Sequence, residues 1–291
     1  MRRTQSIFLV TVGFVASGLY SSTPMAQDDA PAIGEMFQDC PACPAMVWVP
    51  GGRFVMGSPA GERGRDDDEG PRHAVTIARP LAVGIHEVTW DEWDACVGDD
   101  GCPALEGDGM AADQQWGRGT RPVINVSWHD ARRYTAWLRQ LTGSGYRLMS
   151  EAEWEYVVRA GSTARFPFGD DAAALCAHAN GADLATDFNN RNDCFDGMGR
   201  TTAPAGSYEP NAFGVHDMIG NVWEWTQDCW NARFDAAPGD GAAWTDGDCT
   251  QRVVRGGSWG SYPHNLRSAA RYGVAAGYRG HEVGFRVVTV P

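Results

Sequence analysis

The sequence contains no lysine, and all 24 of its basic residues are arginine. We interpret this bias as genome composition rather than as a chemical requirement. Positive charge is also scarce overall, because 37 aspartate and glutamate residues give the 291-residue chain a formal net charge of −13. Nucleic acids and anionic membrane surfaces are bound mainly through cationic side chains. The composition therefore argues against both as partners and favours the binding of cations.

Long apolar segments are absent beyond the N-terminus, and no later stretch is apolar enough to cross a bilayer. The chain begins with Arg2 and Arg3 before an apolar run over residues 6–20. That run has the length of a signal-peptide core and is short for a membrane anchor of roughly 20 residues. We therefore predict a signal peptide over residues 1–26, no remaining membrane span after cleavage at Ala26, and export to the periplasm or the medium.

Regular periodicity is sparse, and from residue 162 to 250 no helical or strand period is readable. This is more irregular chain than an apolar core is expected to order alone. Disulfides, buried tryptophans and metal ions are the candidates for fixing it. We predict an α+β fold with little regular secondary structure, in one domain over residues 46–291 that follows a polar lead-in over residues 27–45.

Three segments have helical patterns that begin at or just after a residue of the N-cap type, namely Thr89, Ser127 or Ser150. The predicted helices cover residues 90–96, 127–143 and 150–161, and the predicted strands lie within residues 46–58, 73–89, 252–259 and 284–290. In the second helix, Ala131, Tyr134, Leu138 and Leu141 are spaced as one apolar stripe. We expect this stripe to face the core.

Eight cysteines in an exported chain indicate disulfides. Eight cysteines allow 105 pairings, so the sequence leaves the pairing open. Three close pairs would each close a short loop: Cys96/Cys102, Cys176/Cys194 and Cys229/Cys249. Cys40 and Cys43 have the C-x-x-C spacing of redox and metal sites, but neither a second such pair nor a thioredoxin-like pattern accompanies them. We expect a structural bridge there.

Residues 216–230, HDMIGNVWEWTQDCW, place three tryptophans among acidic residues. In an extended segment, successive side chains alternate between two faces. Trp223 and Trp225 would then face the core, whereas Glu224 would face the opposite side. A Gly-Asn turn would return Asp217 toward Glu224. The two carboxylates could hold a metal ion together, or the segment could be a strand edge with solvated acids.

Eight separated segments of the chain occur in an order that closely resembles the formylglycine-generating enzyme family, also called sulfatase-modifying factor domains. The resemblance covers about residues 45 to 290 and implies the fold of that family, a loop-rich variant of the C-type lectin fold. The segments are MVWVPGGRFVMGS, HEVTWDEW, RPVINVSWHDARRYTAWL, YRLMSEAEWEYVVRAG, FPFGD, NAFGVHDMIGNVWEWTQD, RVVRGGSW and GFRVV.

Calcium is the cofactor that this resemblance implies, because in that family two calcium ions order the irregular region. We expect one or two Ca²⁺ ions here. The ligands carried over are Asn180, Gly181, Asp196 and Met198 for one ion, and Asp217, Gly220, Val222 and Glu224 for the other. Glycine, methionine and valine would use backbone carbonyls and the others side-chain oxygens, a mixture that calcium favours. Asp217 stands where an asparagine is common in the family.

A cysteine pair is missing where the family has one. In the family's oxidases, two cysteines shortly after the Gly-Gly-Ser motif bind copper(I) and activate oxygen, which converts a substrate cysteine to formylglycine. Here Ser261 stands at the first position, and the chain has no cysteine after Cys249. Soft thiolate ligands select copper(I), and a serine hydroxyl does not replace them. We therefore expect no copper and no oxidase activity of the family type.

The segment after Gly256-Gly257 would still line a cleft. Its candidate residues are Ser258, Trp259, Ser261, His264 and Arg271. Iron would need two histidines and a carboxylate, and His264, His281 and Glu282 are a conceivable set that no spacing enforces. A single histidine in a loop is more often a surface residue. The motifs G-x-S-x-G, P-loop and H-E-x-x-H are absent.

The run Asp66–Glu69 gathers four acids in a loop rich in glycine and arginine. One interpretation is a third cation site. We prefer the alternative, a solvated surface loop, because acidic runs are usually exposed.

Three functions compete. The first is an exported, calcium-ordered accessory or immunity-type factor that binds a protein, a peptide or a small molecule. The second is a tailoring enzyme or an oxidase that uses non-cysteine residues of the Gly256–Arg271 cleft, as some exported relatives without the cysteine pair tailor small molecules such as siderophore precursors. The third, formylglycine generation by unrecognised residues, is the least favoured chemically. The sequence leaves open whether the chain is an enzyme.

Overall fold

The computed structural model describes residues 31–106 and 111–290. The predicted signal peptide lies outside these residues. The described chain is an α+β fold with few, short helices and long loops, as the sequence predicts. None of its helices has both the length and the apolar character to cross a membrane.

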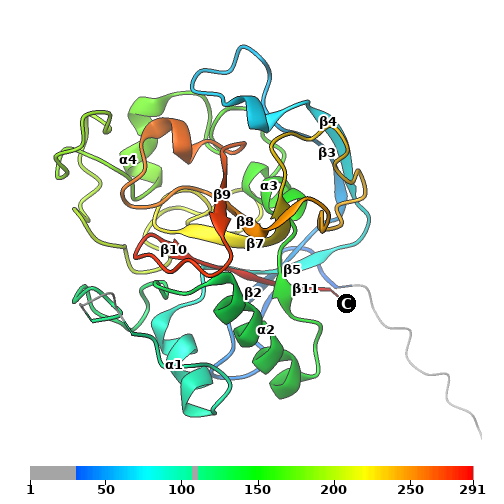
Figure 1. Cartoon of the computed structure of the whole chain (residues 1–291), viewed down its shortest axis with the longest axis vertical. Coiled ribbons are helices and arrows are strands. Elements are labelled where there is room, and N and C mark those ends of the chain that lie inside the picture. The colour runs from blue at the N-terminus through cyan, green and yellow to red at the C-terminus, as the bar shows by residue number, and fades with distance from the viewer. Residues whose placement is uncertain (1–30, 107–110, 291) are drawn as a thin grey trace, which may run out of the picture. The chain divides into compact units, whose positions relative to one another are not determined.

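A five-stranded sheet joins the two ends of the domain (Figure 1). Its order is β1-β2-β5-β11-β6, and every neighbouring pair is antiparallel. The last strand of the chain, β11, therefore lies inside the sheet between β5 and β6. The strands are β1 (Met36–Phe37), β2 (Met46–Val49), β5 (Leu81–Gly84), β6 (Arg147–Leu148) and β11 (Val287–Thr289).

A four-stranded sheet carries the tryptophan-rich segment. Its order is β10-β7-β8-β9, with β10 parallel to β7 and the other pairs antiparallel. A separate ribbon pairs β3 with β4. The strands are β7 (Trp223–Trp230), β8 (Asp248–Arg255), β9 (Arg271–Ala275), β10 (Val283–Gly284), β3 (Gly52–Met56) and β4 (His73–Ile77).

The helices begin where the capping residues predict. The side chains of Thr89, Ser127 and Ser150 each accept an N–H from the third helical residue, and a Glu or Asp there returns the bond. The α-helices are α1 (Trp90–Gly98), α2 (Trp128–Thr142), α3 (Glu151–Arg159) and α4 (Leu175–His178), and the 3₁₀-helices are η1 (Asp67–Glu69), η2 (Ala172–Ala174) and η3 (Pro263–Leu266).

Two details differ from the prediction. Helix α3 ends at Arg159 rather than at Gly161, because Ala160 takes a left-handed conformation with φ of 43°. Leu141 is 47% exposed, whereas Ala131, Tyr134 and Leu138 are fully buried. Leu141 lies in the last turn of α2, where the helix runs away from the sheets (Figure 1).

Four disulfides account for all eight cysteines and confirm the short pairs. They are Cys40–Cys43, Cys96–Cys102, Cys176–Cys194 and Cys229–Cys249. Cys176–Cys194 lies in the irregular chain between α3 and β7, and Cys229–Cys249 joins β7 to β8. Buried tryptophans also contribute to order, since Trp90, Trp93, Trp154 and Trp225 are each no more than 1% exposed.

Candidate functional site

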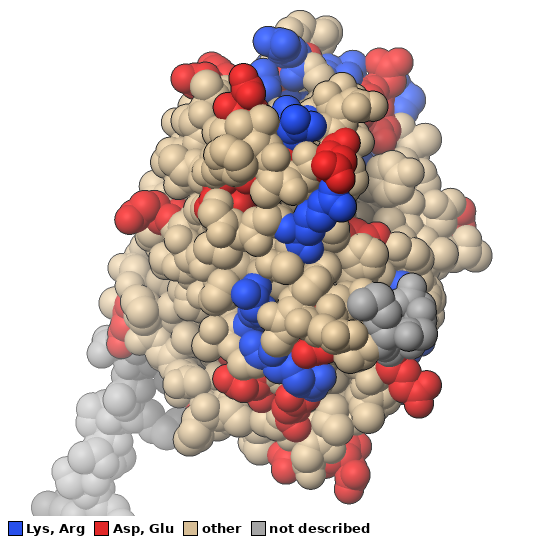
Figure 2. Space-filling model, turned by 90° about the vertical axis from the view of Figure 1, so that its left-hand side faces the viewer, with Lys and Arg blue, Asp and Glu red and all other residues tan. Residues whose placement is uncertain are grey.

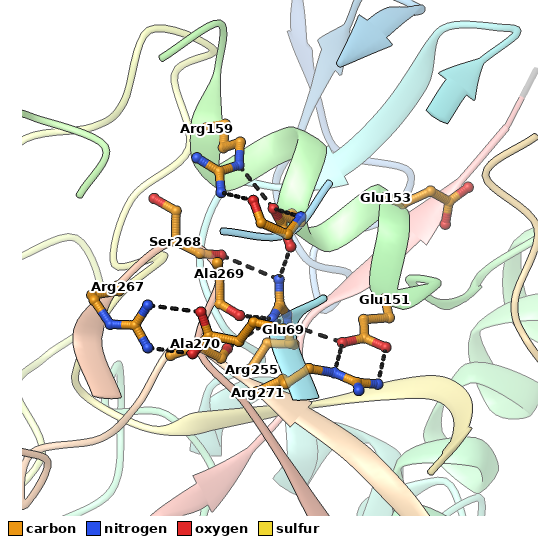
Figure 3. Close-up of polar contacts among 12 residues, drawn as sticks. Glu69, Glu151, Glu153, Arg159, Arg255, Arg267, Ser268, Ala269, Ala270 and Arg271 are labelled. Atoms are coloured by element: carbon orange, nitrogen blue, oxygen red, sulfur yellow. Dashed lines mark hydrogen bonds and ion pairs between the residues drawn. The ribbon is translucent and has the colours of Figure 1, made fainter. Parts of the chain in front are cut away.

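Arg255, the last residue of β8, fixes the start of the Gly256-Gly257 turn. Its side chain is fully buried. Its Nη2 donates to Glu155 of α3 at 2.6 Å, and its Nη1 donates to the carbonyls of Ala269 and Ala270, each at 2.8 Å (Figure 3). These bonds tie β8 to α3 and to the chain that leads into β9. The bonds of Arg255 therefore fix the position of the Gly256-Gly257 turn.

Arg271 does not lie in the cleft that the sequence analysis assigned to it. Its guanidinium donates from Nε and Nη2 to the two carboxylate oxygens of Glu151, at 2.7 and 2.8 Å. Arg267 forms a similar fork with Glu69, and both pairs appear in Figure 3. Lysine presents a single point charge and does not form such a two-pronged pair. The fork geometry therefore favours arginine over lysine at these buried positions.

Glu69 corrects the prediction of a solvated acidic loop. It is 1% exposed because it pairs with Arg267. Asp68 is half-buried, and burial raises its pKa to about 6. The acidic run thus includes a structural ion pair as well as surface carboxylates.

Two serines lie together where the family has its copper chemistry. The Oγ of Ser261 accepts the N–H of Ser258 at 2.9 Å, and the two hydroxyls are 3.3 Å apart. Both residues are buried. Gly257 has a φ of 78°, and a Cβ there would lie 2.7 Å from Leu266, so the turn needs glycine. With every cysteine in a disulfide, the turn has two hydroxyls and no thiol.

A cleft of about 390 Å³ opens beside these serines. We call it the aromatic cleft, because its walls include Phe188, Trp223, Trp259, Tyr262, Tyr278 and His281. Trp259 packs edge-on against Trp116, with ring centroids 5.3 Å apart. The hydroxyl of Tyr278 donates to Glu282 at 2.6 Å on the same wall. The site can therefore stack a flat ligand and still offer polar groups.

The structure brings together only part of the predicted cleft set. Ser258, Trp259 and Ser261 line the aromatic cleft. His264 instead lines a neighbouring cavity of about 510 Å³. Arg271 is buried, as described above. In β7, Trp225 is buried in the core as predicted, and Glu224 is also buried, both at 1% exposed. Trp223, which was predicted to face the core, is only half-buried and lines the cleft.

Phe188, Trp223 and Tyr278 also line this cleft and were not predicted to do so. Trp223 lies in the segment of residues 216–230, where it was predicted to face the core. Phe188 and Tyr278 lie in irregular segments and gave no periodic signal. Their side chains meet in the cleft only through the tertiary fold.

The four residues of the first predicted calcium site lie together. Asp196 accepts the N–H groups of Gly181 and Met198 at 3.0 and 2.8 Å. Burial raises the pKa of Asp196. Oδ1 of Asn180 is buried and has no hydrogen-bond partner within the described chain. An orphaned amide oxygen near a carboxylate fits the oxygen donors that calcium takes.

The second predicted site has one orphaned oxygen and one occupied carboxylate. Oδ1 of Asp217 is buried without a partner among the described residues, whereas its Oδ2 accepts the N–H of Gly206 at 2.5 Å. Both oxygens of Glu224 accept bonds, from Arg286 and from Nε1 of Trp154 at 2.9 Å. Asp217 thus fits a cation ligand, while Glu224 already has a cationic partner in Arg286.

Glu87 joins these two sites and was not predicted. Its Oε1 accepts Nδ2 of Asn221 at 2.9 Å, and Oδ1 of Asn221 accepts Nδ2 of Asn180 at 3.2 Å. Burial and the nearby Asp217 carboxylate raise the pKa of Glu87 well above its usual range. Asn221 itself lies in the predicted Gly-Asn turn, with Gly220 at φ 79°. Glu87, Asn221 and Asn180 therefore form one buried chain of hydrogen bonds that begins at a predicted ligand of the first site.

Within residues 31–106 and 111–290, no three His, Cys, Asp or Glu side chains lie close enough together to hold a metal ion by themselves. The predicted calcium sites rely on backbone carbonyls and on one or two acids each, so they remain predictions.

Figure 2 shows a face on which arginine and acidic side chains are interspersed, without a broad basic region.

Comparison with known proteins gives a family match over almost all of the described chain. Residues 33–290 match the sulfatase-modifying factor enzyme 1-like domain. The formylglycine-generating enzyme of Streptomyces coelicolor is 32% identical, over 82% of this chain and 87% of its own. The mouse inactive C-alpha-formylglycine-generating enzyme 2 is 30% identical, over 84% and 85%. The sequence is therefore similar to relatives with and without the activity.

Solved structures agree with the predicted fold. The structure of PvdO from Pseudomonas aeruginosa superposes with a TM-score of 0.81, is 40% identical, and covers 90% of this chain and 100% of its own. Treponema denticola variable protein 1 superposes with a TM-score of 0.70 at 20% identity, over 88% and 99%. Together these matches confirm the loop-rich variant of the C-type lectin fold.

Proposed function

Because this chain belongs to the sulfatase-modifying factor enzyme 1-like domain family, we propose that it is a member that binds a ligand in the aromatic cleft and does not carry out the family's copper-dependent cysteine oxidation. The observation that carries this proposal is the hydrogen-bonded pair of Ser258 and Ser261 beside the cleft. Copper(I) needs soft ligands. Two hydroxyls and a set of aromatic walls suit binding rather than oxygen activation.

The walls indicate the kind of ligand. Aromatic side chains bury much area and orient flat groups by stacking. The adjoining groove of about 480 Å³ shares Trp223, Tyr278 and Glu282 with the aromatic cleft, so the bound molecule can extend beyond it. We propose a peptide or small molecule with at least one flat apolar group.

Calcium and export belong to the same proposal. The orphaned oxygens of Asn180 and Asp217 support calcium, with Gly181, Asp196 and Met198 holding one ion together with Asn180, and Gly220 and Val222 holding the other together with Asp217. Bound calcium would supply structural order rather than chemistry, because the predicted ligands lie in the irregular chain and not in the cleft lining. Four disulfides support an oxidising compartment such as the periplasm or the medium.

Copper binding gives the direct test of the oxidase part. Purified protein is titrated with copper(I) in competition with a chromogenic chelator, next to the Streptomyces coelicolor enzyme. Both are then incubated with a cysteine peptide that the Streptomyces enzyme oxidises. We expect neither tight copper binding nor peptide oxidation by this chain. Stoichiometric copper and conversion of the cysteine would refute the proposal.

A binding assay tests the cleft. A fluorescent aromatic dye is titrated against the wild type, against Trp259→Ala, and against the control Leu141→Ala, an exposed position on α2 that lines neither the aromatic cleft nor the adjoining groove. We expect Trp259→Ala to weaken binding at least tenfold and the control to change it little. Equal affinities for all three proteins would place the bound dye elsewhere.

A tailoring enzyme is the second candidate. It is favoured by the polar wall of the cleft, where Tyr278 donates to Glu282 next to His281. Such groups can move a proton to or from a bound ligand. A ligand recovered chemically unchanged after prolonged incubation supports binding alone. A changed mass that depends on Glu282 would support the enzyme.

A further inference from the structure

The β3–β4 ribbon has one edge that pairs with nothing in the described chain. Strand β3 is in register with β4 from Gly52 opposite Ile77 to Met56 opposite His73. The outer side of β4 is partly covered, since Thr76 donates its N–H to the carbonyl of Gly239 at 2.9 Å. Within residues 31–106 and 111–290, residues 52–56 form no backbone hydrogen bond except to β4. A free edge of this kind is a template for another strand.

A groove of about 550 Å³ runs along this free edge. Strand β3 forms one wall and the C-terminal end of α3 contributes to the other; Figure 1 shows the two elements near each other. Aromatic rings line the groove, where Tyr156 packs between Phe54 and Phe213 in tilted geometry, with both centroid distances at 5.5 Å. Val55 is 45% exposed at its side. The groove therefore offers apolar surface next to unpaired backbone.

The groove is also positively charged, which is unusual for a chain with a net charge of −13. Its lining includes Arg53, Arg72 and Arg159 and no acidic residue. Arg159 is already bonded to Glu155 at 2.9 Å. Arg53 and Arg72 are exposed, and neither has an ion pair or a hydrogen bond from its side chain to any other described residue. Two guanidinium groups thus remain for a partner.

The two arginines line the same groove near opposite ends of the ribbon. Side chains at Arg53 and Val55 point the same way. Arg72 directly precedes His73, which lies opposite Met56 at the far end of the paired segment, and Gly57 then leaves the extended conformation with a φ of 90°. Arg53 and Arg72 are therefore separated along the ribbon by four residues, or about 13 Å at roughly 3.3 Å per residue. Val55 lies between them.

From this geometry we propose that the groove binds an acidic peptide segment of a partner protein, as an extended strand added to the free edge of β3. Backbone hydrogen bonds to β3 provide affinity. Two carboxylates four residues apart face Arg53 and Arg72, and an apolar side chain between them covers Val55. On the opposite face of the bound peptide, its alternate apolar side chains contact the rings of Phe54, Tyr156 and Phe213. Nucleic acids are disfavoured by the charge of the rest of the chain.

This site is independent of the aromatic cleft, because the two share no lining residue. It assigns a second function, protein recognition, to the groove between β3 and the C-terminal end of α3. Loss of ligand binding in the aromatic cleft would leave this proposal standing, and the reverse holds as well.

Selection from a displayed library of random decapeptides tests the proposal. The wild-type mature protein is the bait, and enriched peptides are measured again with the charge-reversal variant Arg53→Glu/Arg72→Glu. The matched control is Arg133→Glu/Arg139→Glu on α2, whose two arginines are exposed and have no ion pair in the described chain. We expect acidic peptides with carboxylates four residues apart, and at least a tenfold loss of affinity in the first variant only.

Two further readouts test the strand itself. Amide exchange at residues 52–56 should slow on peptide binding, and methylation of alternate backbone nitrogens of the peptide should weaken binding at least tenfold. Failure to enrich any peptide, enrichment without acidic bias, equal binding by both variants, or tolerance of backbone methylation on both alternate sets would each overturn the proposal.

Discussion

Nη2 of Arg286 lies 2.9 Å from Oε1 of Glu224, and both side chains are almost completely buried. The same guanidinium donates to the carbonyls of Gly84 and His216, each at 2.8 Å. Glu224 was predicted from the family resemblance to be a calcium ligand. The ion pair gives this carboxylate a structural role that does not need a metal. It also holds β7 against the chain between β10 and β11.

The first prediction separates these two roles. Glu224→Gln should lower the free energy of unfolding by about 3–5 kcal/mol, because it leaves the buried charge of Arg286 without its partner. The loss should be equal with calcium and with EGTA, as measured by urea unfolding. The apolar double variant Glu224→Leu/Arg286→Met should recover much of it. A loss that appears only when calcium is present would instead make Glu224 mainly a metal ligand.

The second prediction concerns calcium itself. EGTA should lower the melting temperature of the wild-type protein, because a cation that binds only the folded state stabilises it. Asp196→Asn and Asp217→Asn should each reduce the gain that calcium gives, and asparagine also tolerates the left-handed backbone of Asp217, whose φ is 53°. The control Asp193→Asn changes an exposed acid near Asp196. Melting temperatures unaffected by EGTA would count against both calcium sites.

The third prediction tests whether buried arginines are needed as arginines. Arg271→Lys should destabilise the protein by about 1.5–3 kcal/mol, since lysine keeps the charge but loses one of two bonds to Glu151. Arg139→Lys, at an exposed position on α2, should stay within about 0.5 kcal/mol of the wild type. Both are measured by denaturant unfolding. If both substitutions change the free energy of unfolding equally little, genome composition alone would explain the absence of lysine.

The fourth prediction is a pH dependence that comes from Asp68. Burial raises the pKa of Asp68 to about 6 from an ordinary value near 3.8. Between these values the folded protein holds a proton that the unfolded chain releases, so this group stabilises the fold at low pH and the contribution is lost as pH rises through about 6. Asp68→Asn removes the titration.

Urea unfolding at several pH values measures the effect. The stability of Asp68→Asn relative to the wild type should increase as pH rises from about 4 to about 6, while effects of all other groups cancel in the difference. A difference that stays constant over this range, or falls, would show that Asp68 is not held in its protonated form by the fold.

Local features of the fold could be predicted from the sequence. In each of the three capping boxes the two bonded residues are three positions apart, so these hydrogen bonds could be predicted from the spacing. The disulfides join cysteines separated by 3 to 20 positions, and the shortest loops are the ones formed. The ordered motifs also indicated the family and its fold. In the candidate site they indicated Ser258, Trp259 and Ser261, which do line the cleft.

Pairings between distant residues were decided by the tertiary structure. Arg286 and Glu224 are 62 positions apart, and Arg271 and Glu151 are 120 apart. With 24 arginines and 37 acids in the chain, residue type alone does not indicate which will meet. The aromatic cleft and the groove along the free edge of β3 also draw their walls from separate segments. The sequence determined what each short segment does by itself, because those interactions span few residues; only the folded chain decided which charges and rings are brought together, because burial forces each ion to find a partner.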